Sequence, residues 1–325
     1  MMTTLATLQK KYASDLDKLN EHIAGQLSSG NPLMSSVVAA QLRTKGKQIR
    51  PLLLMLCARM FGPVTEKVLC SAAAVELLHN ASLIHDDVVD NSATRRGVAT
   101  INAVWDNHIS VLVGDFFTSS AMQQAIATGD IRIVESLCML GRQLSLGEID
   151  QIFNAREHTL DVDHYFAIID YKTASLFVSS ADMGCLAAGV ADSRRDVLTG
   201  YAAAFGRCFQ IRDDIFDYFS SETVGKPTGN DLREGKITLP LLYALQNAPA
   251  AEADAMRALL GRDSLTDDQI STLQAFARDN GGIERSYETM EELRRSAVEG
   301  LDALPPSDER QALADLFDFI IARNY

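Results

Sequence analysis

The distribution of proline constrains this chain more than any other sequence feature. Eight prolines occur in 325 residues, and none lies between Pro63 and Pro227. Proline inside a helix removes a backbone hydrogen bond and costs about 3 kcal/mol, so a long proline-free stretch rich in Ala and Leu is typical of long helices. Strand signals are weak, because β-branched and polar residues never alternate over a long stretch. The sequence therefore predicts an all-α protein.

Apolar residues recur at helical spacing along this stretch. The 3.6-residue period runs from Val68 to Asp90. Four more long helices are expected at 109–127, 134–153, 162–190 and 196–219. The loop-forming segment 225–231 precedes a helical C-terminal region, in which Ser264 and Ser307 are expected to be N-caps. We therefore expect one domain, residues 1–325, built as a bundle of long antiparallel helices.

The charge balance limits the partners of the chain. It carries 43 acidic and 30 basic residues, for a net charge of −13. Such a balance argues against binding the phosphate backbone of DNA or RNA, so no nucleic-acid partner is expected. Small anionic ligands are still allowed, because basic residues and a metal can reverse the charge of one pocket.

Cysteine usage and hydropathy indicate the compartment. The five cysteines are widely spaced and form no CxxC pair, which is typical of free thiols in a reducing compartment. The least polar long stretch, 173–191, contains Asp182 and several Ser and Gly residues, so we expect no transmembrane segment. The predicted location is the cytoplasm.

The first candidate site is the acidic motif Asp86-Asp87-Val-Val-Asp90. On a helix, Asp86 and Asp90 lie one turn apart and point the same way. Their like charges repel each other unless a cation binds, and carboxylate oxygens at this spacing suit Mg²⁺ completed by substrate phosphates. The alternative is a solvated acidic helix face.

The second candidate site repeats this spacing with Asp213, Asp214 and Asp217, inside the apolar segment FQIRDDIFD. Carboxylates on a helix that packs into a core are costly unless they are paired or bind a metal. If the two helices face each other, six carboxylates line one cavity. Such a cavity needs several divalent cations, and those cations need a polyanionic ligand.

Basic residues recur close to both acidic motifs. They are Lys45, Lys47, Arg50, Arg95, Arg96, Lys172, Lys226 and Lys236. Any one of them alone is an ordinary surface cation, but their recurrence beside the carboxylates favours an anion-binding role. The first three precede a helix expected to begin at Pro51, and helix N-termini favour anions. His79 lies two turns before Asp86, and either packs in the core or points into the same cavity.

Taken in order, these segments resemble the trans-polyprenyl diphosphate synthases of the long-chain type. The resemblance runs from Lys45 to Leu242, through KGKQIRP, His79, the first aspartate motif with Arg95-Arg96-Gly97, Lys172-Thr173, FQIRDDIFD and Glu234-Gly235-Lys236. It implies an isoprenoid-synthase fold, a bundle of long antiparallel helices around a deep central cavity. It also implies a homodimer.

The resemblance implies a role for each matched residue. Asp86, Asp90 and Asp213 would ligate Mg²⁺, as a set of three ions when diphosphate is bound, with Asp87, Asp214 and Asp217 in support. The allylic diphosphate would be held by Arg95, Lys172, Lys226 and Lys236, and isopentenyl diphosphate by Lys47, Arg50, His79 and Arg96. Thr173 and Gln210 would turn oxygen dipoles toward the allylic carbocation. The sequence departs from the family pattern at Lys45, where Gly is common, and at Gln48, where a basic residue is common.

The implied activity is extension of an allylic diphosphate by successive 1′-4 condensations with isopentenyl diphosphate. Ala81 and Ser82 precede Asp86 by about one turn, and small residues there would leave a tunnel open for a long product. Alternatively, they are small only to let two helices approach. A long apolar product would be handed to a membrane, and a quinone side chain is its natural destination.

Other functions remain open at this point. A farnesyl or geranylgeranyl diphosphate synthase would share the same motifs. A non-catalytic helical subunit of a heteromeric synthase would be expected to have lost some aspartates, and none is lost here. A terpene cyclase or a head-to-head synthase can share the fold, but a cyclase lacks the second diphosphate site that Lys47, Arg50 and His79 would supply.

Overall fold

The computed structural model describes residues 4–43, 46–95, 97–219, 228–262 and 264–322. Helices α1 (Leu5–Lys11), α2 (Ala13–Gln26), α3 (Pro32–Arg43) and α4 (Ile49–Arg59) come first. The proline-free stretch forms α5 (Glu66–Val89), α6 (Ile101–Val104), α7 (Asn107–Ala127), α8 (Ile131–Glu157), α9 (Val162–Ile169), α10 (Ser175–Ala187) and α11 (Asp192–Phe216). The C-terminal part forms α13 (Asn230–Arg233), α14 (Leu239–Asn247), α15 (Ala250–Leu260), α16 (Asp267–Asp279), α17 (Gly282–Gly300) and α18 (Asp308–Ala322).

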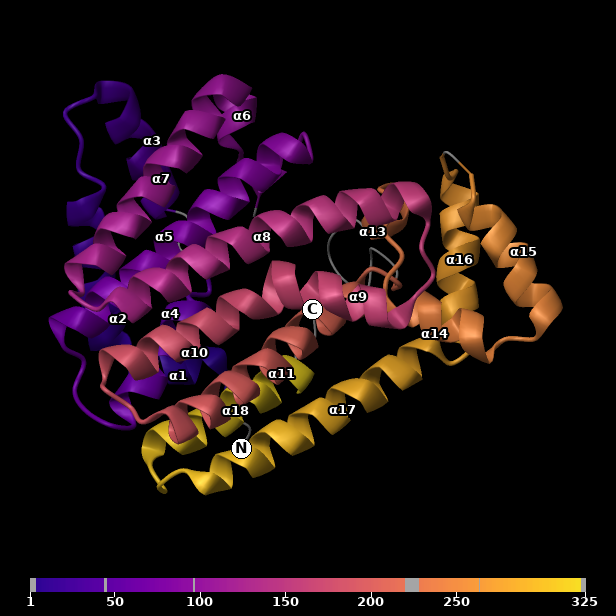
Figure 1. Cartoon of the computed structure of the whole chain (residues 1–325). Coiled ribbons are helices and arrows are strands. Elements are labelled where there is room, and N and C mark those ends of the chain that lie inside the picture. Colours follow the sequence, from indigo (N-terminus) through magenta and orange to yellow (C-terminus); the bar gives the residue numbers. More distant parts are fainter. Residues whose placement is uncertain (1–3, 44–45, 96, 220–227, 263, 323–325) are drawn as a thin grey trace.

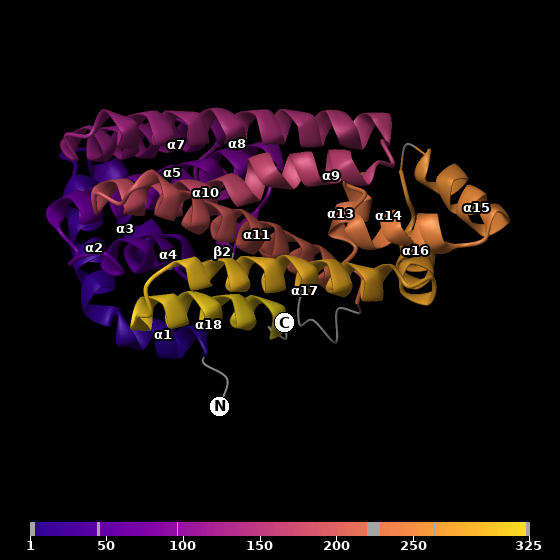
Figure 2. The same cartoon turned by 60° about the horizontal axis from the view of Figure 1, so that its bottom comes forward.

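The long helices lie side by side as a bundle (Figures 1 and 2). The strands in the described ranges are the two-residue β1 (Thr94–Arg95) and β2 (Val98–Ala99), which pair antiparallel after α5. The all-α prediction is confirmed. Two hydrophobic clusters fill the bundle, and α4 and α10 supply side chains to both of them.

Helix α5 is the central element of the bundle. Among the described helices it alone is long and apolar enough to cross a membrane by length and composition, with a mean hydropathy of 1.3. However, 72% of its apolar window is buried inside the protein, mainly against α4, α7 and α10. This burial is typical of a core helix.

Two helix boundaries differ from the sequence prediction. The helix expected to begin at Pro51 begins at Ile49, which places Pro51 in its first turn, where proline is tolerated. Ser307 is confirmed as the N-cap of α18, since its hydroxyl accepts from the Arg310 N–H at 3.1 Å. The prediction for Ser264 was wrong. Thr266 caps α16 because it shares a reciprocal capping box with Gln269, which satisfies two backbone donors at once.

The largest departure lies in the helix expected over 162–190. It is interrupted by one π-helical turn, η1 (Asp170–Ala174), between α9 and α10. A π turn adds a residue to the helical repeat and often marks a functional site. The turn contains Lys172 and Thr173, which the resemblance assigns to the substrate site.

Candidate active site

Two glycines let the π turn lie between α8 and α11. A Cβ atom at Gly147 on α8 would meet the backbone N of Lys172 at 2.8 Å. A Cβ atom at Gly206 on α11 would meet the Cα of Ala174 at 2.5 Å. Real Cβ contacts are not this short, so both positions require glycine for the close approach. The two glycines therefore place Lys172 and Thr173 against the helices that carry the other polar residues.

A chain of hydrogen bonds connects the π turn to the second acidic motif. Thr173 Oγ1 donates to Gln210 Oε1 at 2.7 Å, and Gln210 Nε2 donates to Asp214 Oδ1 at 2.7 Å. The other oxygen of Asp214 accepts from the Tyr165 hydroxyl at 2.6 Å. Because Thr173 uses its only hydroxyl hydrogen on Gln210, its oxygen lone pairs are left to face the cavity. The orientation of the Gln210 amide follows from this network.

Asp214 is a buried carboxyl, 3% exposed. Its pKa is raised well above the ordinary value, first by burial and then by the nearby charge of Asp231, while its bonds from Tyr165 and Gln210 act in the opposite direction. These two donors hold the carboxyl group in one orientation. Asp214 thus fixes Gln210, and through it Thr173.

The first acidic motif lies at the C-terminal end of α5. The pKa of Asp86 is raised to about 6. Burial is the largest cause, Lys172 acts in the opposite direction, and the charges of Glu148 and Asp90 add to the rise. Asp90 is the exposed C-cap residue of α5. Lys172 in turn pairs with Glu148 on α8. The carboxylates of α5 therefore lie within electrostatic range of the π turn.

Lys236 approaches the same place from the segment between α13 and α14. Its Nζ pairs with Glu234 at 2.5 Å. With its amide oxygen facing the two ammonium groups, Gln151 on α8 accepts from Lys172 Nζ at 3.1 Å and from Lys236 Nζ at 3.2 Å. Burial lowers the pKa of Lys236, but Glu234, Asp90 and Asp231 outweigh this and raise it. One amide thus brings the two lysines together.

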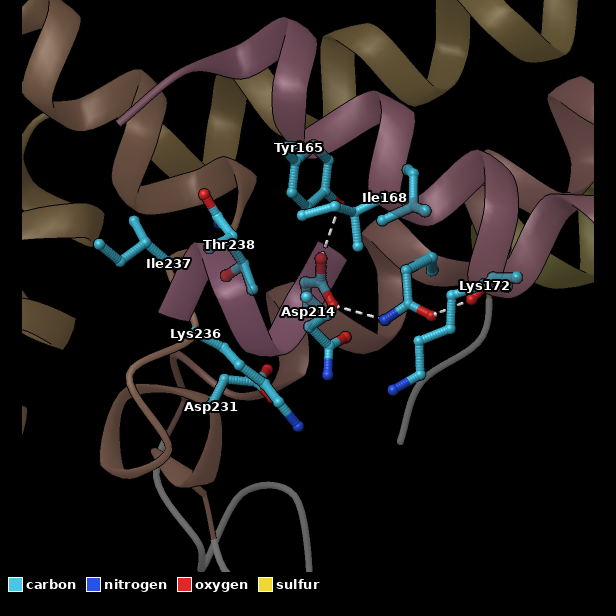
Figure 3. Close-up of a pocket in the computed structure, with 13 residues that line it drawn as sticks. Tyr165, Ile168, Lys172, Asp214, Asp231, Lys236, Ile237 and Thr238 are labelled. Carbon is cyan, nitrogen blue, oxygen red and sulfur yellow. Dashed lines mark hydrogen bonds between the residues drawn. The ribbon is translucent and has the colours of Figure 1, made fainter. Parts of the chain in front are cut away.

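The two lysines, Gln151 and the Asp214 network line a cavity of about 170 Å³. Its lining residues are Gln151, Asn154, Tyr165, Ile168, Ile169, Lys172, Thr173, Gln210, Asp214, Asp231, Lys236, Ile237 and Thr238. Figure 3 shows Lys172 on one side and Lys236 with Asp231 on the other, with Asp214 between them. The pKa of Asp231 is raised to about 7, first by burial and then by the charge of Asp217, and the nearby Lys236 and Lys172 partly offset this rise. Most of the groups that line this cavity are thus polar or charged, with Ile168, Ile169 and Ile237 as its apolar part.

Asp87 and Asp217 are held by partners that lie away from Lys172. Asp87 is buried and accepts from Arg95 Nε at 2.7 Å, and this pair lines a separate pocket between α3, α5 and α6. Asp217 accepts from the backbone N–H groups of Asn230 at 3.2 Å and Asp231 at 3.1 Å, so it caps α13. All six motif aspartates are among the described residues, and Asp214 is the one that lines the cavity around Lys172.

The residues expected to hold isopentenyl diphosphate lie along α4 and α5. The Arg50 guanidinium lies 4.8 Å from the Phe177 ring centroid and 5.9 Å from that of Phe209. His79 is buried at 8% exposure, and Lys47 is exposed beside α4. Arg96 and Lys226 lie outside the described residues.

Six polar residues of this site were not predicted from the sequence: Glu148, Gln151, Asn154, Tyr165, Asp231 and Thr238. Glu148 and Gln151 are three residues apart on α8, which places them on one helix face beside Gly147. This three-residue spacing could have identified Glu148 and Gln151 as candidate site residues from the sequence. For Tyr165 and Asp231 no local pattern exists, because only the packing of α9 and α13 brings them to Asp214.

This fold and site define an all-α isoprenoid synthase. The sequence model of the polyprenyl synthetase family matches residues 31–276. The octaprenyl diphosphate synthase of Haemophilus influenzae is 33% identical over 325 residues, covering 100% of this chain and 98% of the relative. The chain therefore belongs to the polyprenyl synthetase family, and its activity is that of a polyprenyl diphosphate synthase, a transferase of prenyl groups.

Solved structures agree with this assignment. A polyprenyl synthase from Caulobacter crescentus, crystallised with calcium and isoprenyl diphosphate, has a TM-score of 0.91 at 32% identity, covering 100% of this chain and 99% of that one. A geranylgeranyl pyrophosphate synthase from Bacteroides thetaiotaomicron has a TM-score of 0.84 at 35% identity, covering 98% and 99%. Synthases with different products therefore share this fold at similar identity.

Proposed function

We propose that this enzyme is Mg²⁺-dependent and extends an allylic diphosphate by successive 1′-4 condensations with isopentenyl diphosphate, giving a long-chain all-trans-polyprenyl diphosphate for quinone side chains. The observation that carries the proposal is the position of Lys172, which interacts electrostatically with Asp86 of the first motif and with Asp231 beside the second. Curated relatives named as octaprenyl and nonaprenyl diphosphate synthases support the long product.

The donor chemistry of the motif aspartates suits a divalent cation. Asp86, Asp90 and Asp213 would supply hard oxygen donors, and the pKa of Asp86 is raised by burial and by the negative charges of Glu148 and Asp90, which a cation would offset. The calcium in the Caulobacter crescentus relative supports the same donor chemistry. Bound Mg²⁺ would neutralise the charge that develops on the leaving diphosphate.

The residues of this chain have separable roles in the condensation. Lys172 and Lys236 would hold the allylic diphosphate, and Thr173 would direct its lone pairs toward the positive charge that develops as the allylic C–O bond breaks. The double bond of isopentenyl diphosphate then forms the new C–C bond, and the proton it loses passes to the departing diphosphate. Apolar wall residues Ile168 and Ile237 would keep water from the cation.

Protons and Mg²⁺ compete for Asp86, so Mg²⁺ binding should depend on pH. Because the pKa of Asp86 is raised to about 6, this group is protonated at lower pH and cannot hold a cation. Mg²⁺ affinity is expected to be about tenfold weaker at pH 5 than at pH 8. Without Mg²⁺, the folded protein holds the Asp86 proton more tightly than the unfolded chain does. The free energy of unfolding therefore falls as the pH rises from about 4 to 6. Mg²⁺ should therefore raise Tm more at pH 8 than at pH 5, which thermal unfolding measures, and equal shifts would contradict this.

A homodimer is proposed from an exposed apolar surface on α7 and α8. Leu112 and Ile126 on α7 are 64% and 66% exposed, and Ile149 and Phe153 on α8 are both 61% exposed. These two helices form one outer layer of the bundle (Figure 2). Several large apolar side chains exposed on one outer layer are typical of an interaction surface.

Charged residues on this surface should disrupt the dimer. Ile126→Glu combined with Ile149→Glu is expected to give a monomer, because burying two unpaired carboxylates at an interface is unfavourable. Analytical ultracentrifugation measures the outcome. Ala255→Glu, at an exposed position on α15, is the matched control and should remain dimeric. A double variant that sediments as the wild type would refute this interface.

Two further assignments follow from the arrangement of the core. We infer a single domain over residues 1–325, because α4 and α10 contribute to both hydrophobic clusters and leave no boundary between them. We infer a cytoplasmic enzyme without a membrane span, because the apolar helix α5 is buried and all five cysteines are free thiols. Four of these cysteines are buried, and Cys138 is exposed.

Incorporation of labelled isopentenyl diphosphate, with and without Mg²⁺, tests the proposed function. Chromatography of the products should show chains longer than geranylgeranyl diphosphate, formed only with the metal. Products that stop at farnesyl or geranylgeranyl diphosphate would favour a shorter-chain synthase. This is the second candidate function, because the similar structure from Bacteroides thetaiotaomicron is a geranylgeranyl pyrophosphate synthase. No incorporation by the purified chain alone would favour a non-catalytic subunit.

A further inference from the structure

Another cavity, of about 350 Å³, lies at the C-terminal end of α8, and its charged lining residues are mostly basic. They are Arg156, His158, Arg233 and Arg262, together with the acidic Glu234. Arg156 lies in the last turn of α8, Arg233 ends α13, and Arg262 follows α15. Figures 1 and 2 show α15 and α16 near this end of α8. Because the whole chain has a net charge of −13, this concentration of arginine is local.

Most of this positive charge is not compensated within the protein. Among the described residues, the exposed guanidinium groups of Arg156 and Arg262 have no hydrogen-bond or ion-pair partner. Arg233 pairs with Asp267 at 2.9 Å, and its side chain is still 43% exposed. The carboxylate of Glu234 is already paired with Lys236. The cavity therefore carries a net positive charge that an anion from solution can neutralise.

The simplest alternative is that Arg156 only offsets the negative end of the α8 helix dipole. That end carries about half an elementary charge, so one cation is sufficient for it. Arg233 and Arg262 belong to other parts of the chain, and the dipole of α8 does not explain why they line the same cavity. The convergence of three arginines from three separate segments therefore favours an anion site.

The backbone around this cavity adopts conformations that shape it. His158, the C-cap of α8, has a φ of 51°, which is uncommon for residues other than glycine. Gly235 has a φ of 73°, and a Cβ atom there would meet the backbone oxygen of Ala155 at 3.3 Å, so glycine allows this segment to approach α8. The next residue, Lys236, lines the active-site cavity, and Ile237 lines both cavities. The segment 234–237 is therefore a wall shared by the two cavities.

We propose that this cavity is a second binding site for a diphosphate group, adjoining the active site and separate from it. The planar guanidinium group donates two parallel hydrogen bonds to phosphate oxygens. Three such groups match an anion with several negative charges, whereas a monoanion would leave part of the charge uncompensated. The aspartate motifs need a metal before they can hold a diphosphate, but this cavity is already positive. Binding here should therefore not require Mg²⁺, and it does not depend on the condensation.

Arginine footprinting of the purified full-length enzyme in EDTA tests this proposal. Phenylglyoxal modifies exposed guanidinium groups, and mass spectrometry of peptides gives the rate at each arginine. Inorganic diphosphate at about ten times its Kd should slow modification of Arg156 and Arg262 about tenfold. The reference is sodium chloride at the same ionic strength, which gives equal screening. Arg295, an exposed arginine on α17, is the matched control and should react at the same rate in both solutions.

Geranyl diphosphate distinguishes the two sources of a diphosphate group. If free diphosphate is the ligand, both compounds should protect Arg156 and Arg262 equally at equal concentration. If the ligand is a prenyl diphosphate, geranyl diphosphate should protect them at lower concentration, because Leu260 and Leu265 also line the cavity and can contact its chain.

A double variant assigns the protection to this cavity. Arg156→Ala combined with Arg262→Ala should leave Arg233 unprotected, because each lost charge-assisted hydrogen bond weakens binding by about tenfold or more. Its Tm and its incorporation of isopentenyl diphosphate should match the wild type, since neither arginine lines the cavity around Lys172. Loss of incorporation in the wild type would instead contradict the proposed function. Diphosphate that protects neither Arg156 nor Arg262, or protection of Arg233 that persists in the folded double variant, would overturn this second site.

Discussion

Replacing Asp86 by Asn is expected to lower kcat/KM by about 10²–10³-fold, the range typical of losing one preorganised electrostatic contact at a developing charge. The substitution keeps the size of the side chain and removes its charge. Asp86 is a half-buried carboxyl of the first motif, with a pKa of about 6, and it interacts with both Lys172 and Glu148. We therefore expect weaker Mg²⁺ binding together with the lower rate.

Steady-state kinetics over a Mg²⁺ series measures this effect. The matched control is Asp17→Asn on α2, which removes one charge from an exposed position far along the chain from the site. The control should behave as the wild type. If Asp86→Asn keeps its activity within about threefold, Asp86 is not a metal ligand and the proposed site is wrong.

Ser82→Phe is expected to change the product from a long chain to a short one. Ser82 lies one turn before Asp86 on α5, it is half-buried, and its hydroxyl donates to the His79 carbonyl at 2.9 Å within the same helix. Its side chain therefore makes no bond that joins α5 to another helix. If the product grows past this position, as the proposed function implies, an aromatic ring there would block it and stop elongation.

Ala81→Phe is the informative comparison. Ala81 is 1% exposed, so a ring there overpacks the core at a cost of about 1–3 kcal/mol and should lower Tm. Ser82→Phe should keep a Tm near the wild-type value while shifting the product chromatogram. An unchanged product from a stable Ser82→Phe enzyme would show that the chain grows along another path.

The sequence predicted the long helices well because their signals are local. Proline exclusion and 3.6-residue periodicity locate α5, α7, α8 and α11 to within a few residues. The π turn at Asp170–Ala174 was missed, since one added residue changes hydrophobic periodicity too little to be read. The close approach of Gly147 and Gly206 that encloses it depends on three helices separated in sequence.

The two aspartate motifs show where sequence information ends. Their repeated spacing, the basic residues around them and the resemblance they carry determined the family of this protein. Only the tertiary structure decided that Asp87 pairs with Arg95, that Asp217 caps α13, and that Gln151 joins Lys172 to Lys236. The physical reason is that spacing fixes the direction of a side chain from its own helix, whereas its partner is set by whichever helix packs there.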